Sequence, residues 1–72
     1  MRKSALRKQQ QERRAAAARE LSGIQAQLDG SYALLNQTAD PALLEACILE
    51  ISALQSRYGN ALRGLKSLYQ EG

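Results

Sequence analysis

The single cysteine of this 72-residue sequence, Cys47, is its only thiol, and the chain contains no histidine that could activate it. Nucleophilic catalysis needs a base beside the nucleophile, and histidine is also the commonest transition-metal ligand. The carboxylates Glu45 and Glu50 are five residues apart, about 140° around a helix, so they would not converge as a pair. We therefore predict that the protein is not an enzyme and has no catalytic residue, cofactor, metal or small-molecule substrate. Cys47 is interpreted as a buried apolar residue, with a reactive thiol as the alternative.

The second group of candidate functional side chains is basic and lies near the N-terminus. Residues 1–20 include seven basic and two acidic residues, a net charge of +5, whereas residues 21–72 include three basic and five acidic residues, a net charge of −2. Such a segment attracts phosphates without base specificity, although no aromatic residue lies between the arginines to stack on bases. A solvated, solubilising arm is the simpler interpretation, and weak contact with nucleic acid or another polyanion is the alternative. The predicted polyanion contacts are Arg2, Lys3, Arg7, Lys8, Arg13, Arg14 and Arg19.

The elements that would position these residues are helices, because Ala, Leu, Gln, Glu and Arg dominate the sequence. One helix is predicted to begin after Asp40, whose carboxylate can cap it, with Pro41 at its first position. From there, apolar residues alternate spacings of three and four residues, as in a heptad repeat. Ile48, Leu62 and Tyr69 lie one position further along and widen this seam, which favours a bundle of several helices. The predicted oligomer interface comprises Leu44, Cys47, Ile51, Leu54, Tyr58, Ala61, Leu62, Leu65, Leu68 and Tyr69.

An earlier helix is predicted from the same spacing over a shorter distance. Its apolar face comprises Ala17, Leu21, Ile24, Leu28, Tyr32 and Leu35. Upstream of Ala17 this face meets Arg14, Gln10 and Arg7, so residues 1–19 are predicted to form a basic, alanine-rich helical arm with little packing. Residues 20–72 are predicted to form a helical hairpin, since the short polar turn at about residues 36–40 makes the two helices antiparallel neighbours.

Folding the chain at this turn leaves the end of the second helix without an apolar partner. Counting outward from the turn places its last apolar residues opposite polar residues of the arm. The apolar residues are Leu65, Leu68 and Tyr69, and the polar residues are Gln10, Arg13 and Arg14. Small proteins with limited cores often gain stability from a partner subunit. We therefore predict an all-α protein: an antiparallel two-helix hairpin with a basic N-terminal helical extension that dimerises into a four-helix bundle.

A set of residues centred on the second helix carries a resemblance to a known family. These residues are Asp40, Pro41, Leu43, Leu44, Glu45, Ala46, Ile48, Glu50, Ile51, Ala53, Leu54, Gln55, Arg57, Tyr58, Leu62 and Lys66. The pattern resembles the YaaL-like family of small bacterial proteins, mostly from Firmicutes, which is classed as a domain of unknown function. The similarity covers about residues 21–68. The resemblance implies a bacterial cytosolic origin and a short helical protein, and the family has no established activity, ligand or catalytic residues.

The sequence contains no apolar run near the roughly 20 residues that span a bilayer. Its basic N-terminus is not followed by the apolar segment of a secretory signal, so we expect a cytoplasmic location. The leading functional hypothesis is a non-enzymatic interaction or adaptor module that self-associates through the seam of its second helix. The alternative is a small protein that binds nucleic acid or another polyanion non-specifically through its basic arm.

Overall fold

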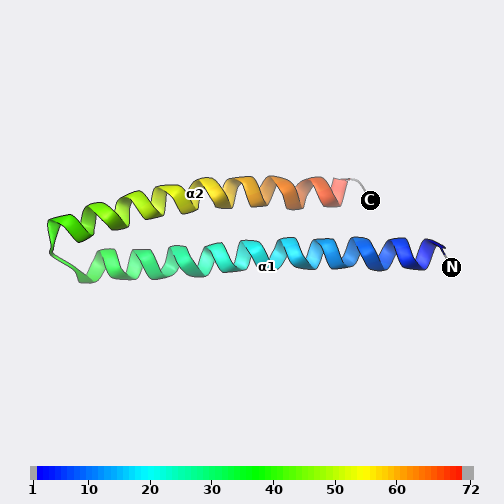
Figure 1. The fold of residues 1–72 in the computed structure, drawn as a ribbon, viewed down its shortest axis with the longest axis horizontal. Coiled ribbons are helices and arrows are strands. Elements are labelled where there is room, and N and C mark those ends of the chain that lie inside the picture. The colour runs from blue at the N-terminus through cyan, green and yellow to red at the C-terminus, as the bar shows by residue number, and fades with distance from the viewer. Residues whose placement is uncertain (1, 71–72) are drawn as a thin grey trace.

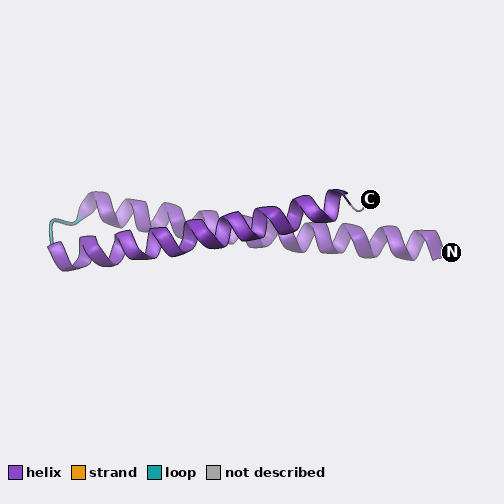
Figure 2. Ribbon diagram, turned by 90° about the horizontal axis from the view of Figure 1, so that it is seen from above, coloured by secondary structure: helices purple, strands orange, loops and turns teal. Residues whose placement is uncertain are grey.

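The computed structural model describes residues 2–70, which form two long helices joined by a short turn. Helix α1 spans Arg2–Gln37 and helix α2 spans Pro41–Gln70. The helices lie side by side in antiparallel directions (Figure 1) and cross at a shallow angle when viewed from above (Figure 2). The described residues contain no strand, so the predicted all-α hairpin is confirmed for this part of the chain. Neither of these helices is long and apolar enough to cross a membrane.

The turn between the helices is held by a backbone hydrogen bond on the α1 side and by a side-chain cap on the α2 side. Helix α1 closes with the amide of Thr38 donating to the carbonyl of Leu34 at 3.2 Å. The carboxylate of Asp40 accepts a hydrogen bond from the amide of Ala42 at 3.1 Å, which satisfies one of the donors that lack a partner at a helix start. The predicted cap at Asp40 is therefore confirmed. The turn is shorter than predicted, because α1 continues to Gln37.

The core is a single layer of side chains between the two helices. A buried cluster joins Ile24 and Leu28 of α1 to Ile51 and Leu54 of α2, with Leu35, Tyr58 and Ala61 packed against it. The covered positions of α1 alternate spacings of three and four residues from Arg14 to Leu35, and the main covered positions of α2 do so from Leu44 to Leu68. This alternation is typical of a coiled coil, here formed by two segments of one chain.

The packed face of α1 differs from the prediction at one position. Ser31 is buried, with 8% of its surface exposed, whereas Tyr32, which was predicted to lie on the apolar face, is 42% exposed. The alternation passes from Leu28 to the residue three positions on, which is Ser31. Tyr32 instead lies beside the seam, where its hydroxyl accepts a hydrogen bond from the side-chain amide of Gln55 at 3.0 Å. The prediction for Tyr32 was wrong because the helical register outweighs the larger apolar surface of tyrosine.

The described part of the predicted arm forms the first part of α1. The helix continues without a break across residues 19 and 20, where the boundary was predicted. Its N-terminal end extends beyond the end of α2 (Figure 1), and residues 4–13 are all exposed. Packing against α2 begins at Arg14, three residues before Ala17.

Candidate functional site

The seam of α2, which was predicted to form an oligomer interface, is largely covered within the single chain. Cys47, Ile51 and Leu54 are buried, and Tyr69 is exposed. The half-buried members of the predicted interface are Leu44, Tyr58, Ala61, Leu62, Leu65 and Leu68. A second chain can therefore reach only the half-buried and exposed members unless it displaces α1. The role of these residues in an oligomer stays a prediction.

Beside the seam, α2 has a row of four accessible side chains, three of which are apolar. Ile48, Gln55, Leu62 and Tyr69 follow one another at seven-residue intervals, so they share one side of the helix. Ile48 and Tyr69 are exposed and Leu62 is half-buried. The hydrogen bond from Gln55 to Tyr32 places Tyr32 on the same side of the hairpin. We call these five residues the apolar flank. The one amide at its centre, that of Gln55, is held by its hydrogen bond to the hydroxyl of Tyr32.

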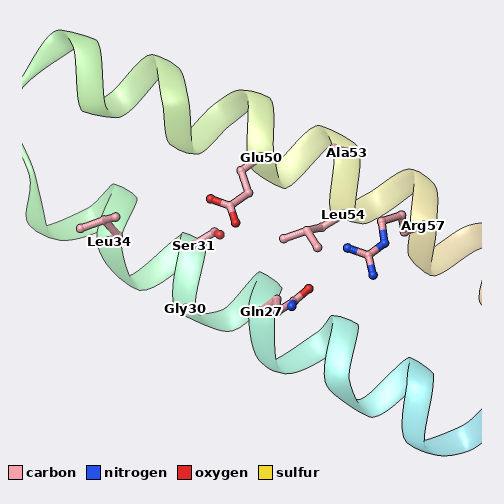
Figure 3. Close-up of a pocket in the computed structure, with 8 residues that line it drawn as sticks. All are labelled: Gln27, Gly30, Ser31, Leu34, Glu50, Ala53, Leu54 and Arg57. Carbon is pink, nitrogen blue, oxygen red and sulfur yellow. The ribbon is translucent and has the colours of Figure 1, made fainter.

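The other side of the hairpin is hollowed and carries charges. A groove of about 420 Å³ lies between the helices there (Figure 3). Its lining residues are Gln27, Gly30, Ser31 and Leu34 of α1 and Glu50, Ala53, Leu54 and Arg57 of α2. Glu50 and Arg57 lie two residues beyond Ile48 and Gln55, about 200° around the helix. Because burying a charge without a partner is costly, this side is less suited than the apolar flank to an apolar contact.

Arg14 occupies a packed position at the end of α2. Its guanidinium carbon lies 4.3 Å from the centre of the Tyr69 ring, and its Nη2 atom donates to the carbonyl of Leu68 at 3.4 Å. The last four carbonyls of a helix have no helical partner and attract cations, so Arg14 caps α2. Its Nε atom is buried and has no hydrogen-bond partner in the described part of the chain. Arg14 therefore lies opposite Tyr69, as predicted, and is less available to phosphates than the exposed basic residues.

The other basic residues of the arm lie in solvent or outside the described side chains. Arg7, Lys8, Arg13 and Arg19 are exposed. Arg2 and Lys3 are part of α1, but their side chains are not described. Arg7, Lys8 and Arg13 point in three directions separated by about 100° or more. A rigid polyanion can therefore contact only some of these charges at once.

The groups that could support catalysis do not gather in one place. Among the described residues, no three Cys, Asp or Glu side chains are close enough together to hold a metal ion. The thiol-bearing residue Cys47 is 2% exposed. The structure thus adds no candidate catalytic centre in this part of the chain, and the absence of enzymatic activity stays a prediction.

Two features of these surfaces were missed from the sequence. The bond between Gln55 and Tyr32 joins residues 23 apart, and its only sequence signal is that Gln55 interrupts the row from Ile48 to Leu62. The charged groove combines small residues from both helices, such as Gly30 and Ala53, and so depends on their register. Neither feature follows from the pattern of one helix alone.

Comparison with known proteins finds no significant similarity: no protein-family model, no curated protein and no solved structure matches the chain. The resemblance to the YaaL-like family therefore stays a prediction. The surfaces that bear on function are the apolar flank, the charged groove and the basic arm.

Proposed function

We propose that the protein is a non-enzymatic helical interaction module that self-associates, with two hairpins packing through their apolar flanks into a four-helix bundle. The supporting observation is that Tyr32, Ile48, Leu62 and Tyr69 remain accessible beside a seam that α1 already covers. Apolar side chains gathered on one side of a small protein often mark a protein contact. The predicted cytoplasmic location belongs to the same proposal.

The dimensions of the hairpin are compatible with such an interface. A stable complex covers about 800 Å² on each partner, which is about one seventh of the chain's accessible surface of 5622 Å². The Cα atoms extend over 59 × 15 × 11 Å, so a long face of the hairpin is of the required size. A single layer of core side chains leaves a small domain marginally stable, and burial of the flank would add to its stability.

The proposed interface differs in part from the one predicted from the sequence. It keeps Leu62 and Tyr69 and adds Tyr32, Ile48 and Gln55. Cys47, Ile51 and Leu54 are left to the core of each hairpin, since they are buried within one chain.

Self-association is tested by sedimentation equilibrium at micromolar concentration, with Ile48→Glu as the disruptive variant. Ile48 is 56% exposed, so glutamate is tolerated in the isolated hairpin but would be buried in the dimer. Because the dimer contains two copies, a cost of about 1.4 kcal/mol in each would weaken association about 100-fold.

Leu49→Glu is the matched control for this experiment. Leu49 is 64% exposed and lies about 100° further around α2, on the side that faces away from α1. This variant should associate as the unaltered protein does. A folded unaltered chain that stays monomeric at micromolar concentration would contradict the proposal.

A second function, non-specific binding of nucleic acid, is favoured by the protruding end of α1. Arg7, Lys8 and Arg13 are exposed, and the N-terminal end of α1 extends past α2 (Figure 1). Because these charges point in different directions, about two or three basic residues could contact one duplex. Counterion release then predicts a slope of about −2 to −3 for log K against log salt.

Fluorescence anisotropy with a random DNA duplex at about 50 and 200 mM salt tests this second function. The double change Arg7→Gln and Lys8→Gln should remove most of the binding. Its control, Arg57→Gln with Arg63→Gln, makes the same change of charge on α2 and should have a smaller effect. If no binding is measured at the lower salt concentration, the second function is wrong.

A further inference from the structure

We infer that the partner of the apolar flank is a second copy of this chain, with its α2 antiparallel to the first α2 across a twofold axis at Gln55. The inference rests on the proposed self-association and specifies its geometry. In such a pair, a residue that precedes Gln55 by a given number of positions faces a residue that follows Gln55 by the same number in the second copy.

The spacing of the apolar residues is self-complementary about Gln55. Ile48 precedes Gln55 by seven residues and Leu62 follows it by seven residues. The twofold axis therefore places Ile48 of each copy against Leu62 of the other copy. At the axis, the two Gln55 side chains meet, and each amide group already donates to Tyr32 of its own chain at 3.0 Å. Since an amide also has an acceptor and a second donor hydrogen, the paired Gln55 side chains can also bind each other.

The charges beside the flank have matching positions. Glu45 precedes Gln55 by ten residues, Lys66 follows it by eleven residues, and both side chains are exposed. The axis at Gln55 therefore brings Glu45 of each copy to within one residue of Lys66 in the other copy, about 1.5 Å along the helix, giving two pairs of opposite charge. Of the charged residues between Glu45 and Lys66, Glu50 and Arg57 point toward the grooved side, about 140–160° around α2 from Gln55. Arg63 lies about 80° from Gln55, in the same direction as Glu45, and carries the same charge as Lys66.

A parallel arrangement of the two α2 helices would be electrostatically unfavourable. It would place Glu45 against Glu45 and Lys66 against Lys66. It would also bring the two arms, each with a net charge of +5 over residues 1–20, to the same end of the bundle. In the antiparallel arrangement, the arms project from opposite ends, so the charge pattern favours this arrangement.

The first experiment reverses the two charges and measures the dimer dissociation constant by sedimentation equilibrium at low salt. Glu45→Lys and Lys66→Glu should each weaken the dimer about tenfold, because each creates two like-charge contacts. The double variant should restore the original affinity. Glu50→Lys, on the grooved side, is the control and should leave the affinity unchanged.

If dimer affinity depended only on the net charge of the chain, this experiment would give a different result. The chain carries +3, so Lys66→Glu lowers the charge and would tighten the dimer if only overall repulsion mattered. Our arrangement requires it to weaken the dimer. A tighter dimer for Lys66→Glu, or a double variant weaker than both single variants, would overturn the arrangement.

The second experiment tests the position of the axis by disulfide cross-linking of Gln55→Cys under mild oxidation. A residue on a twofold axis meets its own copy, so this variant should form a covalent dimer. The unaltered chain, whose Cys47 is buried, and Ala53→Cys on the grooved side should not. If the unaltered chain is dimeric by sedimentation but Gln55→Cys does not cross-link, the axis is wrong and the proposed self-association still stands. If the unaltered chain is monomeric, both fail.

Discussion

Leu54→Ala is expected to lower the free energy of unfolding by about 2–5 kcal/mol, as other buried leucine truncations do. Leu54 is 3% exposed and belongs to the cluster formed with Ile24, Leu28 and Ile51. The change removes apolar contacts and leaves a cavity between two helices that have no second core layer. A domain of this size has about 5 kcal/mol of stability, so a loss at the upper end of this range would unfold a large fraction of the molecules at room temperature. Urea unfolding followed by circular dichroism measures the loss.

Leu6→Ala is the matched control, with the same change of side chain at a position without packing. Leu6 is 61% exposed and lies in the stretch of α1, residues 4–13, in which every residue is exposed. Its truncation should change the free energy of unfolding by less than about 0.5 kcal/mol. The two variants must be compared at one chain concentration, because self-association would stabilise the folded state by mass action. Equal losses would mean that Leu6 is packed as tightly as Leu54 and would contradict an exposed arm.

The two helices and their turn could be predicted from the sequence because their signals are local. Asp40 and Pro41 form a helix start within two residues, and the core positions follow the spacing of three and four residues. Tyr32 could not be placed from residue type alone. Both Ser31 and Tyr32 are close to the seam, and only the exact continuation of the repeat from Leu28 selects the serine.

The candidate interface was harder to predict, because a heptad pattern does not say which helix covers it. The seam from Leu44 to Leu68 would look the same with a partner in the same chain or in a second chain. In the folded chain α1 covers this seam, burying Cys47 and Leu54 among others, which leaves the neighbouring row that begins with Ile48. The contact of Arg14 with the Tyr69 ring shows that the same covering continues into the basic arm, where the sequence offers no apolar partner.

Cys47 is expected to react with a thiol reagent about 10³-fold more slowly in the folded protein than in urea, because the reagent must wait for the helices to separate. The residue is 2% exposed, near the end of the hairpin where the chain turns. An opening free energy of about 4 kcal/mol corresponds to this degree of protection. The release of thionitrobenzoate from an aromatic disulfide reagent, followed by absorbance, measures the rate.

The Ala53→Cys variant places a reference thiol in the same molecule. Ala53 is exposed on the grooved side of α2, so its thiol should react at close to the unfolded rate while Cys47 reacts slowly. Two separate phases, each of one thiol per chain, are therefore expected, and Leu54→Ala should accelerate only the slow phase. A single fast phase of two thiols would mean that α1 and α2 separate readily near the turn. In that case the seam would not be closed by α1, and the sequence-based interpretation of Cys47 as a reactive thiol would gain support over that of a core residue.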